Sequence, residues 1–194
     1  MRQILAAMAL AASADFEVID GTSGVIITKY IGRDVAVEIP PQINDRPVTV
    51  IADRAFRDAG LTSVVIPESI ASIGDEAFAH NHLVRVIIPA RAAFIGILAF
   101  AGNQLTSVVI PEGVVSISEY AFARNRLEGV VIPNTTTSIG SGAFSGNQLA
   151  HIVIGANVRL GGYALNEQFE YFYSENGNQA GTYILHNSEW NFKR

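Results

Sequence analysis

A constant 22-residue period between residues 61 and 148 constrains the fold more than any other feature. This segment divides, without insertion or deletion, into LTSVVIPESIASIGDEAFAHNH, LVRVIIPARAAFIGILAFAGNQ, LTSVVIPEGVVSISEYAFARNR and LEGVVIPNTTTSIGSGAFSGNQ. Leucine opens every unit, and isoleucine, proline, an Ala-Phe pair and asparagine recur at fixed positions. A fixed period in this size range indicates a solenoid, in which each unit buries its apolar side against its neighbours.

The unit that begins at Leu61 predicts the path of the chain in every unit. Alternating residues over Ser63–Ile66 indicate a short strand, which Pro67 ends because proline offers no N–H to a ladder. A second extended segment places Ile73 inward, and Asp75–Phe78 predicts one helical or 3-10 turn that buries the phenylalanine. The asparagine near the end of each unit is expected to satisfy backbone groups at a stacked corner. The fold predicted is therefore a β-dominated repeat solenoid.

Apolar segments at both ends of the array predict caps that shield the terminal units. Alternating segments on either side of Gly21–Gly24 predict an N-terminal hairpin. At the other end, the aromatic run Phe169–Tyr173 precedes a predicted hairpin over residues 181–190. The repeat pattern weakens in the unit after Leu149, where Leu165 and Asn166 replace Ala-Phe. We therefore divide the chain into an N-terminal cap over 15–34, repeats over 35–165 and a C-terminal cap over 166–194.

Residues 1–14 have the pattern of a secretory signal peptide. Arg2 supplies positive charge, residues 4–12 form a short apolar run, and Ala12-Ser13-Ala14 fits a small-x-small cleavage site. A short helix that simply begins the domain is the alternative. The apolar run is too short to cross a bilayer, and no later run reaches that length, so no membrane span is predicted. The expected location is secreted, periplasmic or on the cell surface.

The repeat unit resembles a known family. Its pattern, LxxVxIPxxIxxIGxxAFxxNx, is similar to the BspA-type, or treponemal-type, leucine-rich repeat of bacterial surface proteins, over about residues 16–190. The resemblance implies a leucine-rich repeat fold and an exported or surface-exposed protein. It also implies a role in adhesion to host proteins or other bacteria, and it supplies no catalytic residues to transfer to this chain.

Composition and motifs disfavour several other functions. The formal net charge of -5 disfavours nucleic-acid binding, which usually needs a basic face. The chain has no cysteine, and its four histidines do not have the close spacing of zinc ligands. GxSxG, GxGxxG and P-loop patterns are missing from the sequence. We therefore expect a non-enzymatic protein without metal or cofactor.

Two outward-facing groups of residues are candidate partner-binding sites. Strand alternation places one apolar residue of each unit outward, and stacking aligns them into a column flanked by Arg85 and His151: Val65, Ile87, Val109, Val131 and Val153. The resemblance adds that this position is often threonine in the family. A second group is Phe94, Ile97 and Leu98, where adjacent units carry mostly polar residues. Exposed apolar patches often mark contacts. Alternatively, β-branched residues simply suit a parallel ladder, and a cap or loop covers Phe94.

Two functions remain open on this basis. One is a secreted or cell-surface, adhesin-like module that binds a host or bacterial surface protein. The other is a structural or self-associating component of a cell envelope or secreted matrix. The first predicts saturable binding by a monomer, and the second predicts association that depends on concentration without added ligand.

Overall fold

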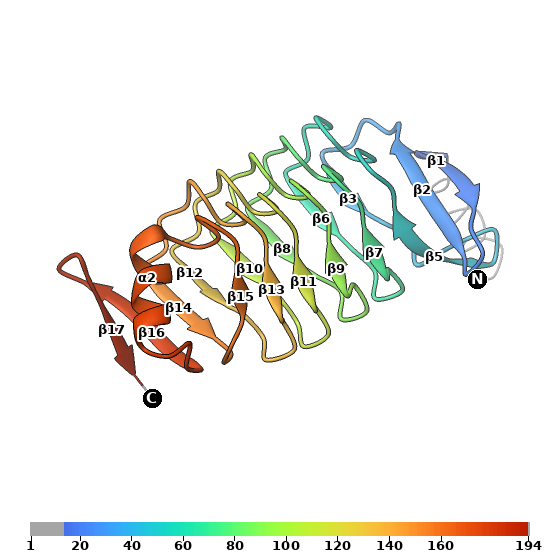
Figure 1. Cartoon of the computed structure of the whole chain (residues 1–194). Helices are drawn as coiled ribbons and strands as arrows, with labels where there is room; N and C mark the ends of the chain where they lie inside the picture. The colour runs from blue at the N-terminus through green and yellow to red at the C-terminus, as the bar shows by residue number, and fades with distance from the viewer. Residues whose placement is uncertain (1–13, 194) are drawn as a thin grey trace.

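The computed structural model describes residues 14–193 and shows a solenoid with β-strands along two of its sides (Figure 1). The first side, which we call the long sheet, is one ladder in the order β1 (Phe16–Asp20), β2 (Val25–Tyr30), β5 (Arg46–Ile51), β7 (Ser72–Ile73), β9 (Phe94–Ile95), β11 (Ser116–Ile117), β13 (Ser138–Ile139) and β15 (Arg159–Leu160). From β2 onward, every pair in this ladder is parallel. The 22-residue solenoid predicted from the sequence is therefore confirmed.

The second side, which we call the short-ladder face, consists of strands that pair two by two. They are β3 (Ala36–Glu38), β6 (Ser63–Val65), β8 (Arg85–Ile87), β10 (Ser107–Val109), β12 (Gly129–Val131) and β14 (His151–Ile154). Strands β3 and β6, β8 and β10, and β12 and β14 form parallel ladders, and the pairs lie next to one another. Both sides thus repeat with the period of the sequence.

A column of phenylalanine rings fills the core between the two sides. Phe56, Phe78, Phe100, Phe122 and Phe144 stack with centroids 4.9–5.4 Å apart and ring planes within 18° of parallel. All five side chains are buried. These centroid separations lie within the range of favourable aromatic pairs, so each ring packs against the next unit as well as its own.

The segment before each buried phenylalanine is a pair of β-turns, where the sequence suggested a helical or 3-10 turn. The carbonyl of Gly74 accepts from the N–H of Ala77, and that of Glu76 accepts from Ala79. Glu76 is left-handed, with φ 54°, which interrupts right-handed helical geometry. Its own N–H and that of Phe78 donate across to the next unit, each at 2.7 Å. Bonds between units therefore replace bonds along a helix.

The asparagine column has the structural role expected from the sequence. Asn103 Oδ1 accepts from the N–H of Leu83, and its Nδ2 donates to the carbonyls of Phe78 and Phe100, at 3.1, 2.9 and 3.1 Å. Equivalent bonds surround the other members of the column, which are Asn81, Asn125 and Asn147. Each side chain therefore connects two units through backbone groups that would otherwise be buried and unpaired.

The N-terminal hairpin is confirmed. Strands β1 and β2 pair antiparallel around the loop at residues 21–24. Phe16 and Tyr30 lie against Phe56, so the hairpin covers the first ring of the column. An irregular first unit follows, in which β4 (Gln42–Ile43) pairs antiparallel with the start of β5.

The C-terminal cap contains the expected hairpin and an additional helix. Strands β16 (Gly181–His186) and β17 (Glu189–Lys193) form the hairpin, and β16 pairs antiparallel with β14. The aromatic run folds into α2 (Glu167–Glu175), which the sequence interpretation missed. The side chain of Asn166 caps this helix by accepting from the N–H of Phe169, at 3.2 Å. Spacings of three and four residues then bring aromatic side chains onto one face, where Phe169 packs against Tyr183 and Trp190.

The predicted signal peptide, residues 1–14, lies outside the described residues except for Ala14. Within residues 14–193, no helix has the length and apolar character needed to cross a membrane.

Replacing Asn103 with alanine is expected to destabilise the fold by about 1–3 kcal/mol, because buried backbone groups of two units lose their partner. Gln104→Ala is the control, since that side chain bonds only to the exposed His82, and it should cost less than about 0.5 kcal/mol. Urea unfolding followed by circular dichroism measures both. Equal midpoints for the two variants would show that the asparagine column adds nothing to stability.

Candidate binding surfaces

An exposed apolar stripe runs along the short-ladder face. Its members are in one register on adjacent strands and are each 46–58% exposed, namely Val65, Ile87, Val109 and Val131. With strands about 4.8 Å apart, the three intervals give a stripe about 14 Å long. The sequence therefore predicted correctly that these four side chains face solvent.

Val153 does not extend this stripe as an exposed residue, so that part of the expectation is wrong. Its side chain is half-buried. The reason lies in the C-terminal cap, because β16 pairs with β14 and sets Thr182 beside Val153. His151, at the start of β14, remains exposed as expected.

A hollow of about 540 Å³ lies at the N-terminal half of the apolar stripe. Val65 and Ile87 line it together with Arg85 and Glu68. Arg85 is exposed, so a cation and a carboxylate border an apolar floor. An apolar centre with a polar rim is the usual composition of a protein interface.

The long sheet carries the second predicted group, which we call the apolar cluster. Phe94 is 58% exposed and Ile97 is 41% exposed. The alternative that a cap or loop covers Phe94 is therefore wrong. Leu98 differs from the expectation, since it is half-buried and left-handed with φ 56°. Phe94 and Ile97 consequently form most of the exposed apolar area here.

The apolar cluster lies where a ladder of two aspartates ends, a ladder that the sequence analysis did not anticipate. Asp53 Oδ1 accepts from the N–H of Asp75 at 2.8 Å, and Asp75 Oδ1 accepts from the N–H of Ile97 at 2.7 Å. The side chain of Ile97 has no oxygen that could accept a hydrogen bond from the next unit. Within residues 14–193, the N–H of Glu119 consequently has no hydrogen-bond acceptor. A stabilising pattern thus stops where an apolar side chain is exposed.

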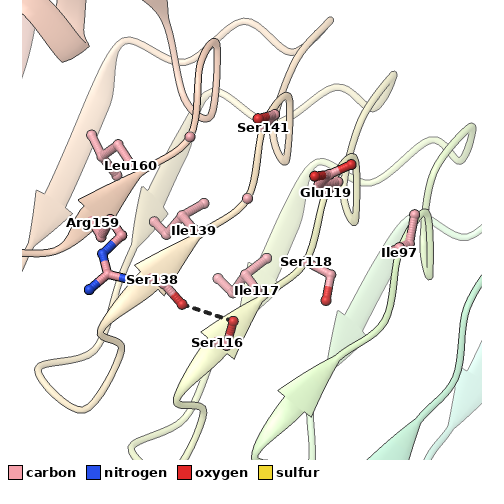
Figure 2. Close-up of a pocket in the computed structure, with 12 residues that line it drawn as sticks. Ile97, Ser116, Ile117, Ser118, Glu119, Ser138, Ile139, Ser141, Arg159 and Leu160 are labelled. Atoms are coloured by element: carbon pink, nitrogen blue, oxygen red, sulfur yellow. Dashed lines mark hydrogen bonds between the residues drawn. The ribbon is translucent and has the colours of Figure 1, made fainter.

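A polar groove of about 450 Å³, which we call the serine groove, lies beside the apolar cluster (Figure 2). Ile97 forms one border, and the polar lining comes from β11, β13, β15 and the turns after them: Ser116, Ser118, Glu119, Ser138, Ser141 and Arg159. The hydroxyls of Ser116 and Ser138 share a hydrogen bond of 3.0 Å. The sequence analysis missed this groove, although its strand residues occupy the repeat position of Phe94.

Charged side chains are paired at the N-terminal end of the long sheet. Arg54 Nη2 lies 2.7 Å from Glu76 Oε1, and Arg57 also bonds to this carboxylate. The hydrogen bond from Arg54 is the main reason that the pKa of Glu76 lies below its ordinary value. Arg159, at the other end, forms no ion pair with any residue in the described part of the chain. The serine groove therefore contains a guanidinium without an ion pair among residues 14–193.

The parallel stack, the asparagine column and the two sheet faces together define a leucine-rich repeat solenoid. The chain belongs to the BspA type leucine-rich repeat family, whose sequence profile matches residues 49–170 in six copies. No curated protein matches the sequence.

The chain is similar to several solved structures. The pneumococcal vaccine antigen PcpA is 17% identical with a TM-score of 0.53, over 73% of this chain and 50% of that one. A leucine-rich repeat protein from Eubacterium ventriosum is 21% identical with a TM-score of 0.53, over 89% and 47% of the two chains. A T. pallidum leucine-rich repeat protein is 26% identical with a TM-score of 0.49, over 80% of this chain and 82% of that one. The chain thus spans about half the length of PcpA and of the E. ventriosum protein.

Ile97→Asp is expected to stabilise the protein by about 0.5–1.5 kcal/mol, because the new carboxylate can accept the N–H of Glu119 and extend the aspartate ladder. Ile97→Ser removes the same apolar group but is too short to replace the aspartate, and it serves as the control. Thermal and urea unfolding compare the two variants. An aspartate variant no more stable than the serine variant would contradict this account of the ladder.

Proposed function

We propose that this protein is a non-enzymatic recognition module that binds another protein outside the cell. The proposed partner is a host or bacterial surface protein, so the role is adhesin-like. The observation that carries this proposal is the exposed apolar stripe of Val65, Ile87, Val109 and Val131. Contiguous apolar surface of this kind is unfavourable in water and is kept mainly where a contact is made.

The rigidity of the stripe favours recognition. Its residues lie on strands whose spacing is set by the ring column and the asparagine column on the buried side. A partner therefore meets side chains that are already ordered, and little conformational entropy is lost on binding. Arg85 and Glu68 add polar groups at the border, which contribute specificity more than affinity.

The interrupted aspartate ladder supports a functional role for the apolar cluster as well. Ile97 replaces an aspartate whose carboxylate would satisfy the N–H of Glu119. Residues that break a stabilising local pattern without a structural gain are expected at functional sites. Family membership further supports recognition as the role of the array, and the vaccine antigen with the same fold supports a location outside the cell.

The double variant Val109→Thr with Val131→Thr is expected to fold normally and to lose most binding to the partner, because it makes the centre of the stripe polar. Val84→Thr with Val115→Thr is the matched control, since these valines are exposed outside the stripe. The partner is first captured from host and bacterial surface proteins, and affinities are then measured by interferometry.

Two outcomes would count against the proposal. Full binding by the Val109 and Val131 variant would place recognition elsewhere. Alternatively, wild-type protein that self-associates with increasing concentration, and binds no other protein, would favour a structural component of an envelope or matrix. Analytical ultracentrifugation without added ligand tests this second outcome, and the stripe variant shows whether the stripe is the contact.

Export is expected to depend on the N-terminal segment. A reporter fused after residues 1–15 should leave a bacterial cytoplasm and be cleaved after Ala14, as the small-x-small pattern predicts. Replacing the small residues at the cleavage site, Ala12 and Ala14, with leucine should leave the reporter uncleaved. N-terminal sequencing of the exported reporter checks the position. An uncleaved reporter that stays inside the cell would contradict the extracellular assignment.

A further inference from the structure

We infer that the outer face of the long sheet binds an extended acidic segment of a partner protein, with an apolar side chain on Phe94 and Ile97 and a carboxylate at Arg159. This inference rests on the proposed role in protein recognition. It concerns the long sheet, whereas the apolar stripe lies on the short-ladder face.

The register of the strands fixes the distance between the two anchors. Phe94, Ser116, Ser138 and Arg159 are aligned on four successive parallel strands. Three intervals of about 4.8 Å separate the first position from the last by about 14 Å. An extended chain advances about 3.4 Å per residue, so the anchors correspond to side chains about four residues apart. The serine groove occupies the space between them (Figure 2).

Arg159 determines the charge of the ligand. It is exposed and has no carboxylate partner within residues 14–193, in contrast to Arg54 and Arg57, which both bond to Glu76. A guanidinium binds a carboxylate through two parallel hydrogen bonds, which gives both energy and orientation. An aspartate or glutamate of the partner is the group that fits this end of the groove.

Unpaired backbone donors near the groove favour a ligand rich in acceptors. Within the described residues, the N–H groups of Glu119 and Ser141 have no acceptor. At the equivalent position in preceding units, aspartate carboxylates accept from the N–H groups of Asp75 and Ile97. A peptide supplies carbonyl acceptors along its backbone and also an apolar side chain for Phe94. An acidic saccharide supplies carboxylates but no comparable apolar anchor.

Glu119 and Arg159 bring opposite charges to the serine groove. Glu119 is the acidic residue that lines the groove, and it is exposed. Its charge opposes that of an acidic ligand, whereas the charge of Arg159 attracts it. Neutralising the two residues should therefore change the affinity in opposite directions.

The experiment uses fluorescent peptides of Ser and Gly that contain one Leu and one Asp, separated by one to seven positions. Fluorescence polarisation with the full chain should show the tightest binding at a separation of about four. Arg159→Gln is expected to weaken binding of that peptide about fivefold, because the variant removes an exposed ion pair between protein and peptide. Phe94→Ser should weaken binding of the same peptide about tenfold, because an aromatic anchor is lost. Glu119→Gln should strengthen binding, because a like charge is removed. Arg91→Gln, which removes an exposed arginine outside the groove, should have no effect.

Several results would overturn the inference. One is an affinity that does not depend on the separation between Leu and Asp in the peptide. The others are unchanged binding by Arg159→Gln and weaker binding by Glu119→Gln. Binding of an oligogalacturonate without binding of any peptide would show that the face takes an acidic saccharide. The variant with Val109→Thr and Val131→Thr separates a failure of this inference about the long sheet from a failure of the function proposed for the apolar stripe. That variant changes only the short-ladder face, and it should bind these peptides normally.

Discussion

The stacking of one unit on the next, about 5 Å away, is the constraint on which the rest of the structure depends. The phenylalanine column maintains this spacing in the core, with centroids 4.9–5.4 Å apart. Ring spacing and strand spacing nearly coincide, so the same repeat satisfies both aromatic packing and backbone hydrogen bonds. The asparagine side chains add polar bonds between units at the corners. A single unit has none of these contacts, and the chain therefore needs an array and two caps.

This regularity also determines how recognition surfaces arise. Stacking converts every outward position of the unit into a row along the solenoid. Rows that keep one residue type, such as the apolar stripe, give a continuous surface of one character. Rows that change residue type, such as the row of Phe94, Ser138 and Arg159, give a surface whose chemistry varies along the array. Because the buried leucine, phenylalanine and asparagine of each unit stay constant, such outward changes alter the surface without altering the fold.

The caps affect function as well as stability. Strand β16 joins the short-ladder face through β14 and limits the exposed part of the apolar stripe to four units. At the other end, the hairpin of β1 and β2 extends the long sheet and covers the first ring of the phenylalanine column, Phe56. The accessible length of each face is therefore set by the capping elements together with the number of repeats.

The sequence by itself determined the period, the inward positions, the two hairpins and the outward orientation of residues such as Val109 and Phe94. These features depend on spacing along the chain and on the alternation of side chains in a strand. The tertiary structure alone decided features that depend on residues one unit or more apart. The carboxylate of Asp75 accepts from a residue 22 positions later, and Val153 is shielded by Thr182 of the cap. Before Phe78, Glu76 adopts a left-handed conformation, and the N–H groups of Glu76 and Phe78 bond to the following unit. The serine groove arises in the same way, because its polar residues come together only when three strands are stacked.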